Sequence, residues 1–339
     1  MKTSQFDYKL PANFIAQTPI EPRYNSRLMV VKRGSNEVEH VHFYELGDFL
    51  KKCDLLVINR TRVLPARIHA YKPTGGKVEI LLLRKIDEQL WETLVGGKGI
   101  KEDMALTISS EVQATVVETL AGSRRLIRFT HPIDTILKNI GEMPLPPYIH
   151  EPLSDPERYQ TIYADRIGSA AAPTAGLHFT EELMTIISNK GIQFAEVTLH
   201  VGLDTFAPVN EDDPHDHAIH QEWCEVTPQT AELINQTHQL GGRVIAVGTT
   251  TVRTLESAYI RTNTKEIIGP YCGMTDLFIL PGFKFHVVDA MITNFHLPRS
   301  TLLMLVSAFS SWQEVKNWYE IGIKEKYRFY SFGDAMLIL

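Results

Sequence analysis

The hydrophobic positions of this chain follow two patterns, which change near residues 60 and 150. In the middle of the chain, short β-rich runs recur between the turn sequences PTGG, GGKG and AGS. These runs read VEILLLRKI, LWETLV, ALTI, VQATVVETL and RRLIRF. Several short strands at this spacing are typical of an antiparallel barrel or meander. The proline-rich stretch GEMPLPPYIHEP that follows predicts a rigid linker or rim loop.

Outside this region, apolar strands alternate with helices. Thr180 and Thr227 are expected to cap helices that end near Gly191 and Gly241. Further helices are expected over residues 251–260, 300–309 and 313–326, and strands over residues 54–59, 192–202, 243–249, 275–280 and 288–295. Strands that alternate with helices indicate an α/β domain with a mostly parallel sheet.

The chain length of 339 residues favours two domains. We therefore predict a large α/β domain with a mostly parallel sheet, formed by residues 1–58 and 150–339. A smaller antiparallel β-barrel domain, residues 59–149, is expected to be inserted into it. No stretch is long and apolar enough to span a membrane, and the N-terminus lacks the apolar region of a signal peptide.

The three cysteines are far apart, form no CxxC pair and suit a reducing compartment, so a cytoplasmic location is expected. The net charge of −6 for the whole chain argues against a nucleic-acid binder. Residues 1–150, however, hold 21 Lys+Arg and 17 Asp+Glu, a net +4, whereas residues 151–339 hold 13 and 23, a net −10. The positive part favours a local surface for a polyanion, although uneven surface charge explains the same count.

Polar residues gather where the predicted strands end, which is where ligands bind in open α/β sheets. The candidates, in chain order, are Thr174, Gly176, His178, His200, Gly202, Asp204, Gly248, Thr249, Thr250, Thr251, Arg253, Glu256, Asn294, His296, Arg299 and Ser300. The GTTT turn and Arg253 combine helix-terminal N–H groups, hydroxyls and a guanidinium, a set that suits a carboxylate or phosphate. A simpler interpretation is that the same residues only cap the helix and bind no ligand.

The stretch SAAAPTAG before His178 consists almost wholly of small residues and proline. It predicts either a tight turn or a bare surface on which a ligand can approach the backbone. A second cluster, His215, His217, His220 and Glu222, has residue types that bind zinc, so a metal-dependent hydrolase is an alternative function. The chain lacks GxxxxGK[ST], a complete GxGxxG and GxSxG, which argues against a P-loop NTPase, an NAD enzyme and a serine hydrolase.

Several long blocks together resemble one enzyme family. They include FDYKLPANFIAQTPIEPRYNSRLMVV, APTAGLHFT, TLHVGLDTFAPV, RVIAVGTTTVRTLESA, TDLFILPGFKFHVVDAMITNFHLPRSTLLMLVSAF and YRFYSFGDAMLIL. Their content and order resemble the S-adenosylmethionine:tRNA ribosyltransferase-isomerase family of queuosine biosynthesis, essentially end to end. One departure is Arg60, which stands where the family is expected to have Asp, as in NDTRV. The role of that Asp is therefore in doubt in this chain.

The resemblance implies a transferase-isomerase that moves and rearranges the ribosyl part of S-adenosylmethionine. The acceptor is the 7-aminomethyl-7-deazaguanine base of tRNA with G at the wobble position, and the products are epoxyqueuosine-tRNA, adenine and methionine. It further implies that S-adenosylmethionine is a consumed substrate, with neither cofactor nor metal required. We expect no membrane partner and a monomer, although the sequence does not determine the oligomeric state.

Roles follow from the resemblance together with the chemistry. A base must remove a C5′ proton made acidic by the sulfonium, and His178, His200 and His296 are the candidates. His178 is the first choice, because the helix N-terminus expected at Thr180 disfavours a protonated ring. Thr249, Thr250, Thr251 and Arg253 are expected to hold the methionine carboxylate, while Thr174, Gly176, Asp204, Gly248, Glu256 and Asn294 complete the substrate site. Arg60, Arg62, Arg67, Arg84 and Lys98 are expected to bind tRNA. A non-catalytic tRNA-binding protein is a further alternative.

Overall fold

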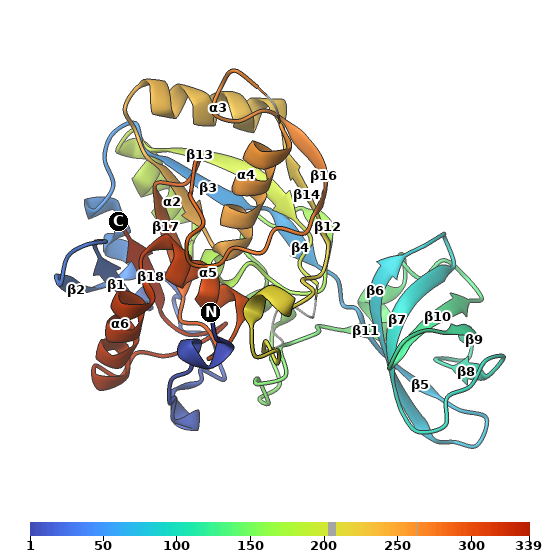
Figure 1. Cartoon of the computed structure of the whole chain (residues 1–339). Helices are drawn as coiled ribbons and strands as arrows, with labels where there is room; N and C mark the ends of the chain where they lie inside the picture. Colours follow the sequence, from blue (N-terminus) through green and yellow to red (C-terminus); the bar gives the residue numbers. More distant parts are fainter. Residues whose placement is uncertain (203–207, 263) are drawn as a thin grey trace. The chain divides into compact units, whose positions relative to one another are not determined.

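A computed structural model describes residues 1–202, 208–262 and 264–339, and the chain divides into two compact units (Figure 1). The larger, here called the α/β unit, comprises Met1–Arg62, Pro147–Arg166 and Ala172–Leu339. The smaller, here called the barrel unit, comprises Val63–Pro146 and Ile167–Ala171. The two units are therefore discontinuous in sequence, because the chain leaves the first, builds most of the second and returns.

The α/β unit is built on a nine-stranded sheet. Its strands, in order across the sheet, are β16 (Tyr271–Thr275), β14 (Glu222–Val226), β13 (Gln193–Leu199), β3 (Leu55–Asn59), β15 (Val244–Val247), β17 (Ala290–Asn294), β18 (Ala335–Ile338), β1 (Arg27–Val31) and β2 (Val38–His42). The four neighbours β13, β3, β15 and β17 run parallel. Strands β14, β16 and β2 add antiparallel edges, and β18 is antiparallel to β17 but parallel to β1.

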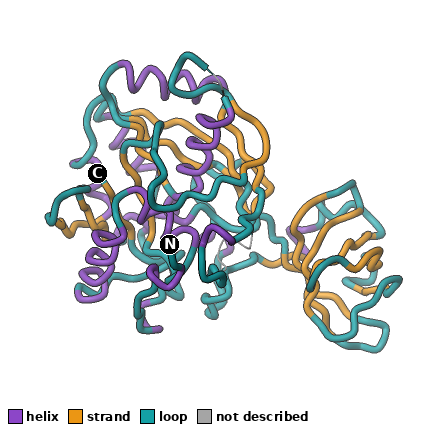
Figure 2. The backbone as a smooth tube through the Cα atoms, viewed as in Figure 1, coloured by secondary structure: helices purple, strands orange, loops and turns teal. Residues whose placement is uncertain are grey.

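Helices cover both faces of this sheet (Figure 2). The α-helices of the unit are α2 (Glu181–Asn189), α3 (Pro228–Gln239), α4 (Thr249–Arg261), α5 (Thr301–Phe309) and α6 (Trp312–Lys324). Its 3₁₀ helices are η1 (Thr3–Phe6), η2 (Ala12–Phe14), η3 (Arg23–Asn25), η4 (Phe43–Asp48), η5 (Pro156–Tyr159), η6 (Thr174–His178) and η8 (Pro214–Asp216). None of the helices in the described ranges is both long and apolar enough to cross a membrane.

Alternation along the central strand β3 explains the two layers. Leu55 and Val57 belong to the apolar core shared with α3, α4, α5 and α6. Leu56 and Ile58 belong to the core on the other face, shared with α2 and η4. Successive side chains of a strand point to opposite faces, and a central strand buried on both sides therefore reads as the continuous apolar run LLVI.

The barrel unit is a closed antiparallel barrel in which β5 pairs with both β6 and β8. Its strands are β5 (Arg67–Tyr71), β6 (Lys77–Lys85), β7 (Leu90–Gly96), β10 (Arg124–Phe129), β9 (Gln113–Thr119) and β8 (Ala105–Thr107), with β11 (Gly141–Glu142) beside β5 and α1 (Leu137–Ile140) before it. The strands β4 (Thr61–Val63) and β12 (Arg166–Ser169) form a separate pair. These observations confirm the predicted fold class, a large α/β domain with a smaller antiparallel β-barrel.

Local signals placed most helices correctly. The side chains of Thr180 and Thr227 accept hydrogen bonds from the backbone of α2 and α3, as predicted for caps, and Ser300 does the same for α5. The predicted strand over residues 275–280 is wrong, because β16 ends at Thr275. Beyond it the backbone bonds to side chains instead, since Leu277 donates to Thr275 Oγ1 and its carbonyl accepts from Arg253.

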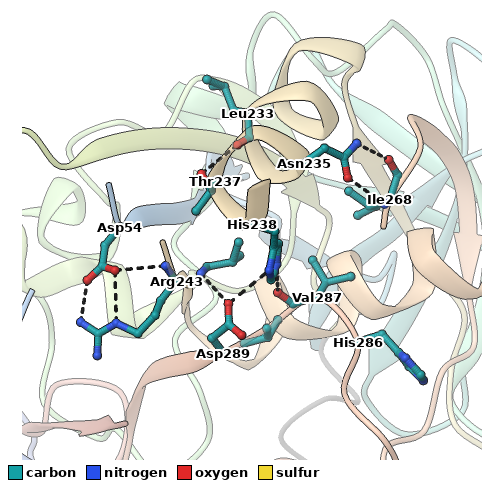
Figure 3. A network of polar contacts seen from close by, with 12 residues as sticks. Asp54, Leu233, Asn235, Thr237, His238, Arg243, Ile268, His286, Val287 and Asp289 are labelled. Carbon is teal, nitrogen blue, oxygen red and sulfur yellow. Dashed lines mark hydrogen bonds and ion pairs between the residues drawn. The ribbon is translucent and has the colours of Figure 1, made fainter. Parts of the chain in front are cut away.

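Polar residues at the amino ends of the parallel strands form hydrogen bonds and ion pairs with one another (Figure 3). Asp54, directly before β3, accepts hydrogen bonds from Arg243 directly before β15, with Nη2 2.5 Å from Oδ2. Asp289, directly before β17, accepts from the amide of Val244 at 2.8 Å. His238, in the last turn of α3, lies 3.7 Å from the Asp289 carboxylate. The polar side chains at this edge of the sheet therefore stabilise the fold. A ligand site is expected at the opposite, carboxyl edge.

Candidate active site

A pocket at the carboxyl edge of the sheet, here called the main pocket, is lined by segments that follow several strands. The turn Gly248–Thr250 follows β15, residues 293–297 end and follow β17, and residues 172–175 form a third wall. Tyr330 and Ser331 precede β18, which is antiparallel to β17 and so begins at this same edge. Tyr148, Val201, Ser300 and Leu302 complete the lining. Residues far apart in the chain thus meet where α/β sheets bind ligands.

The β15–α4 turn gives the main pocket a helix N-terminus. Gly248 has a φ of +92°, a conformation that L side chains rarely adopt, and this lets α4 start directly after the strand. The amides of Thr249 and Thr250 donate to none of the residues that the structure describes, as expected for the first turn of a helix. Thr250 Oγ1 accepts from Asn59 Nδ2 at 3.2 Å. Thr251 is fully buried and its hydroxyl donates to the Val247 carbonyl, so it does not line the pocket.

The small-residue stretch forms one wall of the main pocket through Ala172, Pro173, Thr174 and Ala175. Gly176 is different, because a Cβ at this position would lie 2.1 Å from Tyr163 Oη. Its missing side chain therefore makes room for a neighbouring tyrosine and not for a ligand. The first part of SAAAPTAG therefore lines a pocket, whereas its last glycine serves local packing.

His296 lines the main pocket, and its backbone is clamped by two tyrosines. Tyr8 Oη donates to its carbonyl at 2.5 Å, and its amide donates to Tyr319 Oη at 2.8 Å. The ring atom Nε2 lies 2.7 Å from Thr293 Oγ1, while no described residue hydrogen-bonds Nδ1. Burial lowers the pKa of His296 to about 3, so the ring is neutral at physiological pH.

His178 lies behind the main pocket and is connected to it by hydrogen bonds. Its Nδ1 is 2.8 Å from Ser26 Oγ, and Asn294 Nδ2 is 3.4 Å from its Nε2. Thr174 Oγ1 in turn donates to Asn294 Oδ1 at 2.8 Å. Burial is the first cause, and the charges of two arginines the second, that lower the pKa of His178 to about 3. The ring lines a separate pocket that contains Arg23 and Arg158.

His200 lies at the end of β13 and does not line the main pocket. Its Nδ1 is 2.8 Å from Thr61 Oγ1, and its ring stacks on Trp223 with centroids 5.1 Å apart. Burial, and secondarily the charge of Arg166, lowers the pKa of this histidine. The three histidines are thus all disfavoured in the charged form, but only His296 is on the wall of the main pocket.

Arg253 does not line the main pocket with Thr249 and Thr250 but a second pocket, here called the Arg253 pocket. Its Nη1 donates to Glu222 Oε2, and its Nε donates to the Leu277 carbonyl at 3.1 Å. Glu256 is fully buried and accepts from the amides of His286, Val287 and Val288 at 3.0–3.2 Å, so it holds a loop. The residues expected to form one substrate site are therefore divided among two pockets and the core.

Asp204 lies outside the described residues. Sequence reasoning also missed wall residues, above all Tyr148, Tyr330 and Ser331. Tyr148 Oη lies 2.7 Å from Ser331 Oγ, and Tyr330 packs on Tyr148 with ring centroids 4.9 Å apart. Tyr148 belongs to the proline-rich stretch GEMPLPPYIHEP, which predicts a linker or rim loop. Tyr330 and Ser331 belong to YRFYSFGDAMLIL, where the sequence resembles the family but does not indicate a pocket wall.

In the described part of the chain, the histidine cluster is not arranged as a metal centre. His215 Nδ1 is 2.6 Å from Asp213 Oδ1, and His217 Nδ1 is 2.9 Å from Glu211 Oε2, so these two rings face different carboxylates. Among residues 1–202, 208–262 and 264–339, no group of three or more His, Cys, Asp or Glu side chains is placed to hold a metal ion. The geometry gives no support to the metal-dependent hydrolase.

The cations expected to bind tRNA differ in their surroundings. Arg60, at 16% exposure, faces the carboxylates of Glu196, Asp165 and Glu225 at 3.1, 3.7 and 4.0 Å. Arg62 pairs with Glu157, Arg67 with Glu79 and Arg84 with Glu92. Lys98 is exposed, and no carboxylate in the described part of the chain pairs with it. Arg60, the departure from the family pattern, thus sits among acidic side chains and not on the pocket wall.

Comparisons with known proteins point in one direction. A family profile described as queuosine biosynthesis protein matches residues 3–338. The chain is 50% identical over 344 residues to an S-adenosylmethionine:tRNA ribosyltransferase-isomerase of Staphylococcus haemolyticus, and 51% identical over 346 residues to one of Dehalococcoides mccartyi. Both alignments cover both proteins in full. A crystal structure of S-adenosylmethionine tRNA ribosyltransferase from Thermotoga maritima is 40% identical, with a TM-score of 0.58 and coverage of 99% of this chain and 100% of that one.

Proposed function

Because the chain belongs to the queuosine biosynthesis protein family, we propose that it is an S-adenosylmethionine:tRNA ribosyltransferase-isomerase. The observation that carries this conclusion is about half identity, over the whole length of both chains, to enzymes of that name. The enzyme transfers and isomerises the ribosyl moiety of S-adenosylmethionine onto the 7-aminomethyl-7-deazaguanine base of tRNA. Epoxyqueuosine-tRNA, adenine and methionine are the products.

In this proposal the reaction takes place in the main pocket, with His296 as the base. A sulfonium makes the protons on C5′ acidic, and a neutral imidazole can accept one of them. His296 is the candidate on the pocket wall, and its Nδ1 accepts no hydrogen bond from the described residues. The lowered pKa makes it a weak base, so the acidity of the sulfonium must supply the driving force.

The other walls provide for a flat, polar substrate. The small side chains of Ala172, Thr174 and Ala175 allow a ring to approach the backbone closely. The amides of Thr249 and Thr250, at the positive end of the α4 dipole, are suited to donate to a sugar hydroxyl or to the adenine as it leaves with its electron pair. Neither role requires a metal or a bound cofactor.

The tRNA is proposed to bind through cations of residues 1–150, where the positive charge of the chain lies. Lys98 and Arg84 are the most exposed of the proposed contacts, whereas Arg60 is already surrounded by three carboxylates. Phosphate contacts of this kind position a nucleic acid without reading its sequence. We further propose that the tRNA carries G at the wobble position and that the chain acts as a monomer in the cytoplasm.

The direct test is release of adenine from S-adenosylmethionine in the presence of tRNA that carries 7-aminomethyl-7-deazaguanine. Adenine should appear in proportion to modified tRNA, and the same tRNA with unmodified guanine should give none. Release that does not depend on the modified base would contradict the transferase function. Absence of release from folded protein that binds both substrates would instead favour a non-catalytic tRNA-binding protein.

A further inference from the structure

The Arg253 pocket contains a buried ion pair among mostly apolar side chains, with His217, His220 and Thr301 as its other polar residues. Arg253 and Glu222 are 5% and 4% exposed, and both line this pocket. Around them lie apolar side chains, chiefly Ile219, Leu277, Phe278, Ile279, Leu302 and Leu305. Burying a charged pair is costly, and such a pair is weak support for stability by itself. Its position on a pocket wall therefore suggests a binding role.

One nitrogen of the Arg253 guanidinium has no hydrogen-bond partner among the described residues. Its Nη1 donates to Glu222 and its Nε to the Leu277 carbonyl, but Nη2 is buried and has no hydrogen-bond partner among the described residues. Buried polar groups in proteins nearly always have a partner, so each exception needs a reason. A ligand with an acceptor aimed at Nη2 would supply the missing bond.

The charges of this pocket indicate what kind of ligand fits. Arg253 and Glu222 together carry no net charge, and nearby His217 already faces the Glu211 carboxylate at 2.9 Å. A simple anion such as phosphate would meet Glu222 as well as Arg253 and be repelled by it. A ligand with one anionic and one cationic group on the same carbon, such as an α-amino acid, presents a carboxylate to the arginine and an ammonium to the glutamate.

The Arg253 pocket also adjoins the main pocket, because Leu302 at the start of α5 lines both. A ligand that extends from one pocket past Leu302 would therefore reach the other. S-adenosylmethionine has this composition, with an adenosine part joined through sulfur to an α-amino acid. We infer that the Arg253 pocket binds the α-amino-acid end of S-adenosylmethionine, with Arg253 Nη2 donating to the carboxylate and Glu222 facing the ammonium.

This inference rests on the proposed function and assigns the carboxylate to a site apart from the GTTT turn. The test compares binding of S-adenosylmethionine and of its decarboxylated analogue by calorimetry, without tRNA. The wild type should prefer the carboxylated ligand by about 10- to 100-fold, the usual effect of one hydrogen bond between charged groups. This first comparison needs no variant, and equal affinity of the wild type for the two ligands would overturn the inference.

Two variants locate the effect. Arg253→Gln should bind S-adenosylmethionine about 10- to 100-fold more weakly and should no longer distinguish it from the analogue. Arg253→Lys keeps the charge beside Glu222, and should fold if the glutamine variant does not, with an intermediate preference. The matched control is Arg261→Gln on the same helix, where the arginine is exposed and pairs with Asp276 at 2.8 Å, and it should keep the wild-type preference.

The outcomes separate this inference from the function on which it rests. A wild-type preference that survives in both Arg253 variants would overturn the subsite while leaving the transferase function intact, because adenine release would continue. A wild type that binds neither ligand and releases no adenine would contradict the proposed function, and the subsite with it.

Discussion

His296 has one ring nitrogen held by Thr293 and its ring on the wall of the main pocket, which distinguishes it from His178 and His200. His296→Gln is expected to lower turnover by about 10²–10⁴-fold, the usual effect of removing a general base. Affinity for S-adenosylmethionine, measured separately by calorimetry, should change little. His215→Gln is the control, because that ring is exposed and pairs with Asp213. Near-normal turnover of the His296 variant would move the base to another residue, His200 first.

The buried histidines also predict how stability depends on pH. Burial lowers the pKa of His178 in the folded protein to about 3, whereas an unfolded histidine titrates near 6.5. Between these values the unfolded chain binds more protons, so the free energy of unfolding falls as the pH drops below about 6.5. Urea unfolding at pH 7.5 and 5.5 should show this fall, and His178→Gln should reduce it by on the order of 1 kcal/mol. An unchanged pH dependence in the variant would show that His178 is protonated in the folded state.

At the level of single residues, the sequence predicts part of the candidate site. Thr249, Thr250, Asn294 and His296 were selected because they lie at strand ends, which can be recognised from local apolar runs, and the structure has all four on the wall of the main pocket. The direction of a side chain on a helix is not read in this way. Arg253, one turn into α4, donates a hydrogen bond to Glu222 at the start of β14. Only the tertiary fold brings these two residues together.

Among the elements, η6 (Thr174–His178) depends on one glycine. Gly176→Ala would place a Cβ 2.1 Å from Tyr163 Oη and 2.9 Å from Thr161 Cγ2. Overpacking of this kind costs about 1–3 kcal/mol, so the melting temperature should fall. Tyr163→Phe in the same chain should restore part of the loss, because it removes the closest atom, a hydroxyl with no hydrogen-bond partner in the described part. No loss of stability in Gly176→Ala would show that Tyr163 moves away freely.

Local sequence determines some of the helices and strands, whereas others depend on distant parts of the chain. Caps such as Thr180 and Thr227 act within one turn, which explains why helices α2 and α3 were predicted at the right residues. Strands β1 and β18 were missed, because each is a short apolar run whose pairing partner lies at the other end of the chain, Leu28 opposite Ala335. Residues 275–280 look like a strand in composition, yet their backbone is used by Thr275 and Arg253. Tertiary partners thus outweigh β propensity.

For the whole molecule, the proposed tRNA surface predicts a particular salt dependence. Arg84→Gln together with Lys98→Gln should flatten the plot of log affinity for tRNA against log salt concentration by up to about two units, roughly one per lost phosphate contact. The control is Lys316→Gln with Lys324→Gln on α6, which removes the same charge from the α/β unit. Equal slopes for wild type and the barrel variant would place the tRNA elsewhere.

The order of strands in the nine-stranded sheet has a consequence for biosynthesis. Strand β3 is made before the barrel residues, but its neighbours β13 and β15 are made after them, and β1 waits for β18. Domains generally fold as units while the chain emerges from the ribosome. The barrel, whose strands are nearly contiguous in sequence, can close early, whereas β1 and β3 remain without their parallel partners until much later. Nascent chains of this protein therefore expose the apolar side chains of β1 and β3 through most of translation, and such unpaired strands favour aggregation.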